Sequence, residues 1–158
     1  MSFRRIFVFW ATSAFLAACG FSPAYAPEGS GQEIRESITV RPASSRVEFD
    51  FASRMEARIG RSAAPTYELN YYLTSLGVGS DAGSTRLVYK GMVTWTLTDI
   101  ATQARVAGGQ IRGAVARSTT ASSVASYAAE VDAERRIATM LADKLVLHLL
   151  ASDFPEHR

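Results

Sequence analysis

The sequence is poor in the residues that carry most enzyme chemistry. Its 158 residues include one cysteine and two histidines. A single cysteine allows no disulfide within the chain, so stability must come from a packed core. The sequence has no HExxH, GxSxG or Walker motif, and its carboxylates are scattered without an evident pair. His148 and His157 are more typical of structural or solvent-facing positions than of catalytic ones. We therefore expect no enzymatic activity, no catalytic residue, no cofactor and no metal site.

The charge balance argues against a nucleic-acid partner. The chain has 17 Lys and Arg residues and 15 Asp and Glu residues. Loss of Arg4 and Arg5 with an N-terminal signal leaves 15 residues of each sign, so the mature protein is formally neutral. The sequence also lacks the Lys/Arg-rich runs that follow a phosphate backbone. Any affinity for an anion must come from the local placement of a few cations.

The one cysteine closes a pattern at the N-terminus. Arg4 and Arg5 precede an apolar run at 6–16, and the residues Leu-Ala-Ala-Cys occupy 16–19. This order is typical of a bacterial secretory signal, and the cysteine makes it a lipoprotein signal, because its thiol is the acceptor for the lipid. A lone cysteine is otherwise most often a small apolar residue in a core, but here the flanking regions agree with one another. We predict that Cys19 is lipid-modified and begins the mature chain.

The predicted anchor sets the location and the domain boundaries. The apolar run at 6–16 is shorter than the ~20 residues that span a bilayer. We therefore expect acyl chains to attach the protein to a membrane that it does not cross. Gly20 stands where an aspartate typically retains such proteins at the inner membrane, which predicts the periplasmic side of the cell outer membrane. Residues 1–18 are interpreted as a signal peptide, 19–33 as an extended tether rich in Pro and Gly, and 34–154 as a single domain.

Hydrophobic periodicity within this domain predicts six elements. They follow the order strand, helix, three strands and helix, at about 38–41, 46–59, 67–74, 86–98, 105–117 and 126–151. Ser45 and Glu48 fit a capping box at the start of the first helix, and Gly60 favours its end. Gly77 and Gly79 supply turn chemistry after the second strand. The fold class is therefore α+β, with two helices packed on one face of a four-stranded, mostly antiparallel sheet.

Each predicted helix carries one apolar stripe that should face the sheet. The two stripes consist of Val47, Phe51, Met55 and Ile59, and of Ala133, Ile137, Leu141, Leu145 and Leu149. Asp132 and Arg136 lie one turn apart and should pair. The last turns, 145–150, are apolar on all sides except at His148. We therefore expect these turns to be covered on more than one side.

A tight turn at 100–102 sets the register of the following hairpin. Pairing Asp99 with Gln103 places large residues opposite small ones along the two strands, as packing under a helix would require. The same register places Lys90 directly opposite Arg112, with Arg86 nearby. Like charges in that position are unfavourable without a neutralising partner. Two interpretations stay open: both side chains are solvated on an exposed face, or the three cations contact lipopolysaccharide or another anion.

The start of the mature chain resembles the lipopolysaccharide-assembly lipoprotein family (LptE-type). The resemblance rests on the lipobox, on the sequence Cys-Gly-Phe-Ser-Pro-Ala-Tyr at 19–25, and on the order strand, helix, three strands and an Ala-rich final helix that contains Asp-Ala-Glu-Arg at 132–135. It implies a periplasmic domain that plugs the lumen of the outer-membrane β-barrel LptD, helps that barrel to assemble, and binds lipopolysaccharide. Family members are thought to contact lipopolysaccharide through basic residues near the tip between the second and third strands. Here the tip at 80–84 carries Asp81 and no cation before Arg86.

Two other functions remain possible interpretations of the sequence. An auxiliary lipoprotein of an ABC-type lipid-transport system would also be small, α+β and tethered. A small envelope hydrolase would need a paired carboxylate or an activated hydroxyl near His148. The partner that copurifies with the protein separates the first of these from the barrel hypothesis.

Overall fold

The computed structural model describes residues 37–80, 86–118 and 123–152. The elements within these residues are β1 (Ile38–Val40), α3 (Arg46–Ile59), β2 (Tyr67–Ser80), β3 (Arg86–Asp99), β4 (Arg105–Ser118) and α4 (Ser123–Ala151). The predicted signal peptide, the tether and Cys19 lie outside the described residues, as does the strand tip with Asp81.

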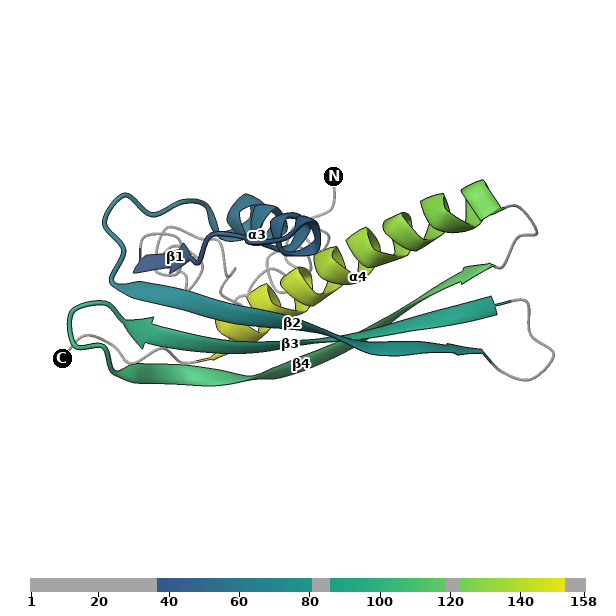
Figure 1. Ribbon diagram of the computed structural model, residues 1–158. Coiled ribbons are helices and arrows are strands. Elements are labelled where there is room, and N and C mark those ends of the chain that lie inside the picture. The colour runs from purple at the N-terminus through teal and green to yellow at the C-terminus, as the bar shows by residue number, and fades with distance from the viewer. Residues whose placement is uncertain (1–36, 81–85, 119–122, 153–158) are drawn as a thin grey trace, which may run out of the picture.

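The strands form a sheet in which sequence order is also spatial order. Within the described residues the order is β1-β2-β3-β4, with β1 parallel to β2 and the other neighbours antiparallel. Figure 1 shows α3 and α4 on the same side of the three long strands, with no helix on the opposite side among the described elements. The predicted class, two helices with a mostly antiparallel sheet, is confirmed.

The first helix begins and ends where its local sequence predicts. The Ser45 hydroxyl accepts a hydrogen bond from the Glu48 amide at 3.2 Å, which satisfies one of the free N–H groups of the first turn. Gly60 has φ 78°, in the left-handed region that glycine adopts at helix ends, and its amide donates to the Glu56 carbonyl at 2.8 Å. Phe51, the centre of the predicted stripe, is fully buried.

The second helix confirms its predicted stripe and most of the expected cover over its last turns. It begins at Ser123, three residues before the predicted start. All five residues of the stripe are buried. Leu147, by contrast, is 59% exposed and His148 is also exposed. Leu145, Val146 and Leu149 are each 0% exposed, and both the sheet and α3 pack against this helix, so the expected cover is confirmed at these residues and is wrong at Leu147.

The register of the β3–β4 hairpin differs from the predicted one by two residues. The loop holds four residues rather than three, because the Asp99 amide donates to the Ala104 carbonyl at 2.9 Å and Gln103 turns the chain with φ 57°. A bulge beside Leu97 then adds one more residue to β4. Together, the longer loop and the bulge shift the pairing by two residues. Each residue therefore keeps its predicted side of the sheet but pairs with a different residue.

Lys90 therefore pairs with Ala114, and Arg112 pairs with Met92. The predicted direct opposition of Lys90 and Arg112 was wrong, and so is the like-charge repulsion that it implied. An even shift preserves which side of the sheet each side chain occupies, since side chains alternate along a strand. Both cations accordingly remain on the side away from the helices.

Strand β2 continues past the point where a turn was expected. Gly77 and Gly79 pair with Lys90 and Val88 of β3 and so belong to the strand. The register slips between Ser75 and Gly77, where Gly77 has φ 96°. As a result the three long strands extend well beyond α3, as Figure 1 shows.

Helix α4 packs closely on the sheet at two paired glycines. Gly91 and Gly113 face each other across β3 and β4. A Cβ atom at Gly91 would lie 2.9 Å from the Ile137 Cδ1, and one at Gly113 would lie 3.0 Å from the Met140 Sδ and 3.3 Å from the Leu141 Cδ2. Side chains of α4 therefore rest on strand backbone, which is possible only because these positions lack a Cβ.

Ion pairs join the two helices along their shared side. Arg54 donates two hydrogen bonds to the Asp143 carboxylate, at 2.9 and 3.0 Å, and Arg46 lies 2.7 Å from Glu134. Within α4, the predicted ion pair of Asp132 with Arg136 is also confirmed, at 2.7 Å. Such partly exposed pairs contribute about 0–1 kcal/mol each. The pairs between the two helices therefore orient α3 on α4 more than they stabilise the fold.

We predict that Gly91→Val destabilises the protein by about 1–3 kcal/mol, because the new side chain overpacks against Ile137. The measurement is the free energy of unfolding in urea. Gly79→Val is the matched control, since a Cβ at Gly79 would meet nothing within 4 Å. Gly91→Val combined with Ile137→Ala should recover part of the loss. Equal losses for the Gly91 and Gly79 variants would contradict a close helix contact at Gly91.

Candidate functional site

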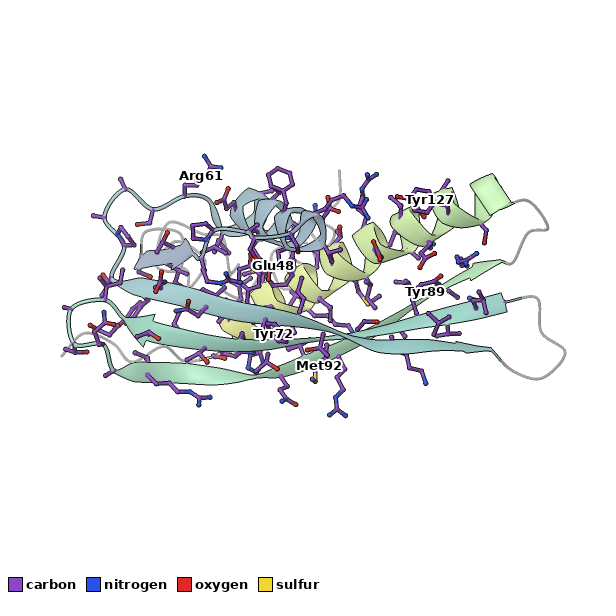
Figure 2. The ribbon with its side chains drawn as sticks, viewed as in Figure 1. Glu48, Arg61, Tyr72, Tyr89, Met92 and Tyr127 are labelled. Carbon is purple, nitrogen blue, oxygen red and sulfur yellow. The ribbon has the colours of Figure 1, made fainter. Side chains whose placement is uncertain are left out.

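A cavity of about 320 Å³ lies where α3, α4 and the strands diverge. It is bounded by the start of α3, the middle of α4 and the central parts of β2 and β3. The lining combines apolar side chains with a few polar and charged ones, among them Val47, Glu48, Leu73, Val78, Tyr89, Glu130, Ile137 and Leu141. Figure 2 shows Tyr89 in the space between α4 and the sheet.

Glu48 is the buried polar residue of this region, and its carboxylate is already satisfied. It accepts hydrogen bonds from the Ser44 hydroxyl at 2.6 Å, from the Ser44 amide at 2.7 Å and from Arg41 at 3.2 Å. These bonds, with Ser44 first and Arg41 adding a smaller attraction, outweigh burial and hold the pKa of Glu48 below its usual value. The carboxylate therefore stays ionised at neutral pH and anchors the start of α3.

Arg41 extends this anchor to the sheet. Its guanidinium donates to the Tyr71 carbonyl at 3.0 Å and lies 4.8 Å from the centre of the Tyr71 ring. Burial raises the pKa of the Tyr71 hydroxyl, and the negative charge of Glu48 adds to the effect. The cluster fixes α3 against the edge of β2. The polar groups of the cluster bond to one another, so we interpret the cluster as structural rather than catalytic.

The predicted anion contacts lie on the side of the sheet away from the helices, but only two of the three are close together. Lys90 and Arg112 are diagonal neighbours on β3 and β4, a relation in which Cα atoms are typically about 7–8 Å apart. Arg86 pairs with Ser118, four residues from Lys90, or about 13 Å along the strand. Met92 lies on the same side of the sheet in Figure 2. The structure thus brings Lys90 and Arg112 together around Met92 and leaves Arg86 apart.

A fourth cation, Arg117, was not predicted from the sequence, and it lies on the helix side of the sheet. The Arg117 Nε donates to the Tyr89 hydroxyl at 3.0 Å, and the guanidinium lies 5.4 Å from the centre of the Tyr89 ring. Longer contacts of 3.5 Å join it to the Ser126 hydroxyl of α4. Strand alternation combined with the correct register would have placed Arg117 beside Tyr89. Its role is to tie the end of β4 to the start of α4.

The described residues contain neither a metal centre nor a membrane-spanning helix. Within 37–80, 86–118 and 123–152, no three His, Cys, Asp or Glu side chains are grouped so that they could hold a metal ion. In the same ranges no helix has the length and apolar character needed to span a membrane.

The sequence matches no protein-family model and no curated protein. Solved structures do resemble the fold. A candidate lipoprotein from Caulobacter crescentus CB15 gives a TM-score of 0.64 at 25% identity, over 77% of this chain and 93% of that one. A minor lipoprotein from Acinetobacter baumannii gives 0.55 at 14% identity, over 77% and 94%. A rare lipoprotein B from Shewanella oneidensis gives 0.48 at 9% identity, over 72% and 91%.

The structural neighbours are thus bacterial lipoproteins, and they share nearly their whole length with this chain. This agrees with the lipoprotein signal predicted from the sequence around Cys19. The domain built from β1, α3, the three long strands and α4 is accordingly a fold that bacterial lipoproteins adopt.

The Glu48 anchor generates a pH prediction. Because the folded-state pKa is lowered, the carboxylate stabilises the protein above the unfolded-state pKa of about 4.3, and this contribution is lost as the pH falls through the folded value. We expect Glu48→Gln to reduce the unfolding free energy at pH 7 by about 1–3 kcal/mol, since hydrogen bonds to a charged group are lost. The difference from the parent protein should shrink below pH 4.

Chemical unfolding at pH 7 and pH 3 provides the measurement. The exposed Glu130 supplies the control, because Glu130→Gln should change the unfolding free energy little at either pH. A Glu48→Gln loss of the same size at both pH values would rule out an ionised, hydrogen-bonded carboxylate.

Proposed function

We propose that the protein is a non-enzymatic outer-membrane lipoprotein, anchored through Cys19 on the periplasmic side, that acts with the barrel protein LptD in lipopolysaccharide assembly. The observation that carries the proposal is the agreement between two independent features. The N-terminal sequence has a lipobox followed by the Cys-Gly-Phe-Ser-Pro-Ala-Tyr motif, and the domain shares its fold with the Caulobacter crescentus CB15 protein over 93% of that chain.

The shape and charge of the domain suit a plug within a polar barrel. The long strands and α4 make an elongated body (Figure 1), and ion pairs hold its helices together at partly exposed positions. The mature chain is formally neutral, so neither sign of charge would dominate contacts with a polar lumen. An acyl anchor also keeps the domain beside a membrane partner at high effective concentration.

Within this proposal, Lys90 and Arg112 are the residues that contact lipopolysaccharide, and Arg86 is a more distant contributor. Lipopolysaccharide carries phosphate groups, and cations bind phosphate through charge-assisted hydrogen bonds. Lys90 and Arg112 are exposed and adjacent on one side of the sheet. Met92 between them offers an apolar contact, which suits an amphiphilic ligand.

Copurification tests the partner. We expect the full chain, extracted in mild detergent, to bring down LptD at a fixed ratio. Cys19→Ser should leave the membrane fraction while the domain stays folded, as judged by circular dichroism. Recovery of an inner-membrane transporter in place of the barrel would favour the ABC-type alternative. Absence of any barrel from the wild-type preparation would disprove the proposed function.

Charge removal tests the contact residues. The double variant Lys90→Ala, Arg112→Ala should weaken binding of purified lipopolysaccharide about tenfold or more, as loss of two charge-assisted contacts implies. Arg61→Ala is the matched control, because Figure 2 places Arg61 at α3, on the opposite side of the molecule from Met92. Fluorescence titration with labelled lipopolysaccharide measures both affinities. Equal affinities for the double variant and the control would place the ligand elsewhere.

A further inference from the structure

The described residues protect the outer edge of β4 along one part of its length. Among the described strands β4 is the last of the sheet, so within these residues one side of its backbone has no neighbouring strand. Side chains of α4 fill part of this gap: Lys144 donates to the Arg112 carbonyl at 3.0 Å and Arg136 donates to the Ala116 carbonyl at 3.3 Å. Cationic side chains at an exposed edge are a common means of discouraging further strand pairing.

These two bonds also reveal which residues of β4 face outward. In an antiparallel strand the N–H and C=O groups of one residue point to the same side, and successive residues alternate. Since Arg112 and Ala116 have outward carbonyls, the even-numbered residues face the open side. The next outward groups along the strand therefore belong to Gln110 and Gly108.

The protection by α4 stops before these two residues because of helix geometry. From Arg136 to Lys144 the helix rises about 12 Å, which matches the roughly 13 Å between Ala116 and Arg112 on a strand. Gln110 lies about 7 Å further along, level with the next turn of α4. That turn presents Leu147, which is 59% exposed, and His148, whose ring lies 5.5 Å from the Trp95 ring, and neither side chain bonds to the strand. Among the described residues, nothing bonds to the outward backbone groups of Gly108 or Gln110.

The unprotected stretch has the properties of a strand-pairing site. It runs from Ala107, next to the bulge of β4, to Ile111, and its sequence Ala-Gly-Gly-Gln-Ile carries no charge and no proline. Prolines, charges and bulges are the usual obstacles to pairing at an edge. The two glycines leave the backbone accessible, and the exposed Leu147 on the neighbouring turn of α4 offers an apolar side chain to an added strand.

The charges around this stretch favour an acidic occupant. Arg112 and Lys144 stand at one end, and the guanidinium of Arg105 lies over Gly108. The nearby Asp143 is already bound by Arg54 and Arg58. A second copy of this chain, paired antiparallel about Gly108, would bring Arg105 of one molecule close to Arg112 of the other, and like charges oppose that arrangement.

We propose that the β4 edge at 107–111 binds an extended, acidic segment of a partner protein, which adds to the sheet as a fifth strand. Backbone hydrogen bonds to Gly108 and Gln110 supply the affinity, and alternate side chains supply the specificity. An apolar side chain of the segment contacts Leu147, while acidic side chains lie beside Arg105 and Arg112. The site shares Arg112 with the proposed lipopolysaccharide contact but differs from it in using the backbone of Gly108 and Gln110, and it does not depend on the identity of the membrane partner.

Amide hydrogen exchange tests the site on the detergent-solubilised full chain. The probe is a synthetic, end-capped peptide of alternating valine and glutamate, and its counterpart carries lysine in place of glutamate. The acidic peptide should slow exchange at the Gly108 and Gln110 amides by about tenfold, as one net hydrogen bond implies, and the basic peptide should not. Protection by both peptides alike, or by neither, overturns the proposal.

Two variants make the test specific to the edge. Gln110→Pro removes the outward donor, and proline is tolerated on edge strands. Leu147→Glu places a like charge beside the acidic peptide at an already exposed position. Both should abolish the protection at Gly108, whereas Ala114→Pro, further along the same edge, should not. Protection that rises with protein concentration in the absence of peptide would assign the edge to a second copy of the chain and so refute the proposal.

Discussion

The contact of α4 with the paired glycines Gly91 and Gly113 is the constraint on which the rest of this structure depends. It brings the helix onto strand backbone, with Ile137 and Leu141 filling the space that a Cβ would occupy. The height of α4 above the sheet then determines where its outer side chains end. Arg136 and Lys144 reach the edge of β4, and Asp143 reaches Arg54 of α3. One close contact therefore positions the second helix, the ion pairs and the protected part of the edge.

The parts of the fold that depend on neighbouring residues could be predicted from the sequence. The Ser45 cap, the Gly60 stop and the buried stripes of both helices follow from local hydrogen bonding and from a 3.6-residue period. The hairpin register could not be predicted, because it depends on how many residues the loop at 100–103 uses and on one bulge near Leu97. Neither leaves a clear signal in composition. The length of β2 could not be predicted for a similar reason, since the pairing with β3 overrides the turn preference of Gly77.

The same distinction applies to the candidate site. Strand alternation correctly placed Lys90 and Arg112 on one side of the sheet, but their mutual position needed the register. Predicting the contacts of Arg117 and the unprotected part of the β4 edge would have required the position of α4 relative to the strands, which no local sequence pattern contains. Glu48 was recognised as a capping residue, yet its bonds to Ser44 and Arg41 involve residues before the helix. The local sequence thus identified some residues of the site, whereas the tertiary contacts determine which residues lie next to one another.

The slip in β2 between Ser75 and Gly77 has a consequence for comparing this chain with its relatives. Before the slip, the odd-numbered residues of β2 face the helices, as Leu73 does opposite Val93; beyond it, Val78 pairs with Tyr89 and the even-numbered residues take that side. An alignment drawn through this segment without a one-residue gap would match inward positions of one protein with outward positions of another that lacks the bulge. Divergence at these positions would then look like loss of hydrophobic character where the layering of the two proteins is the same.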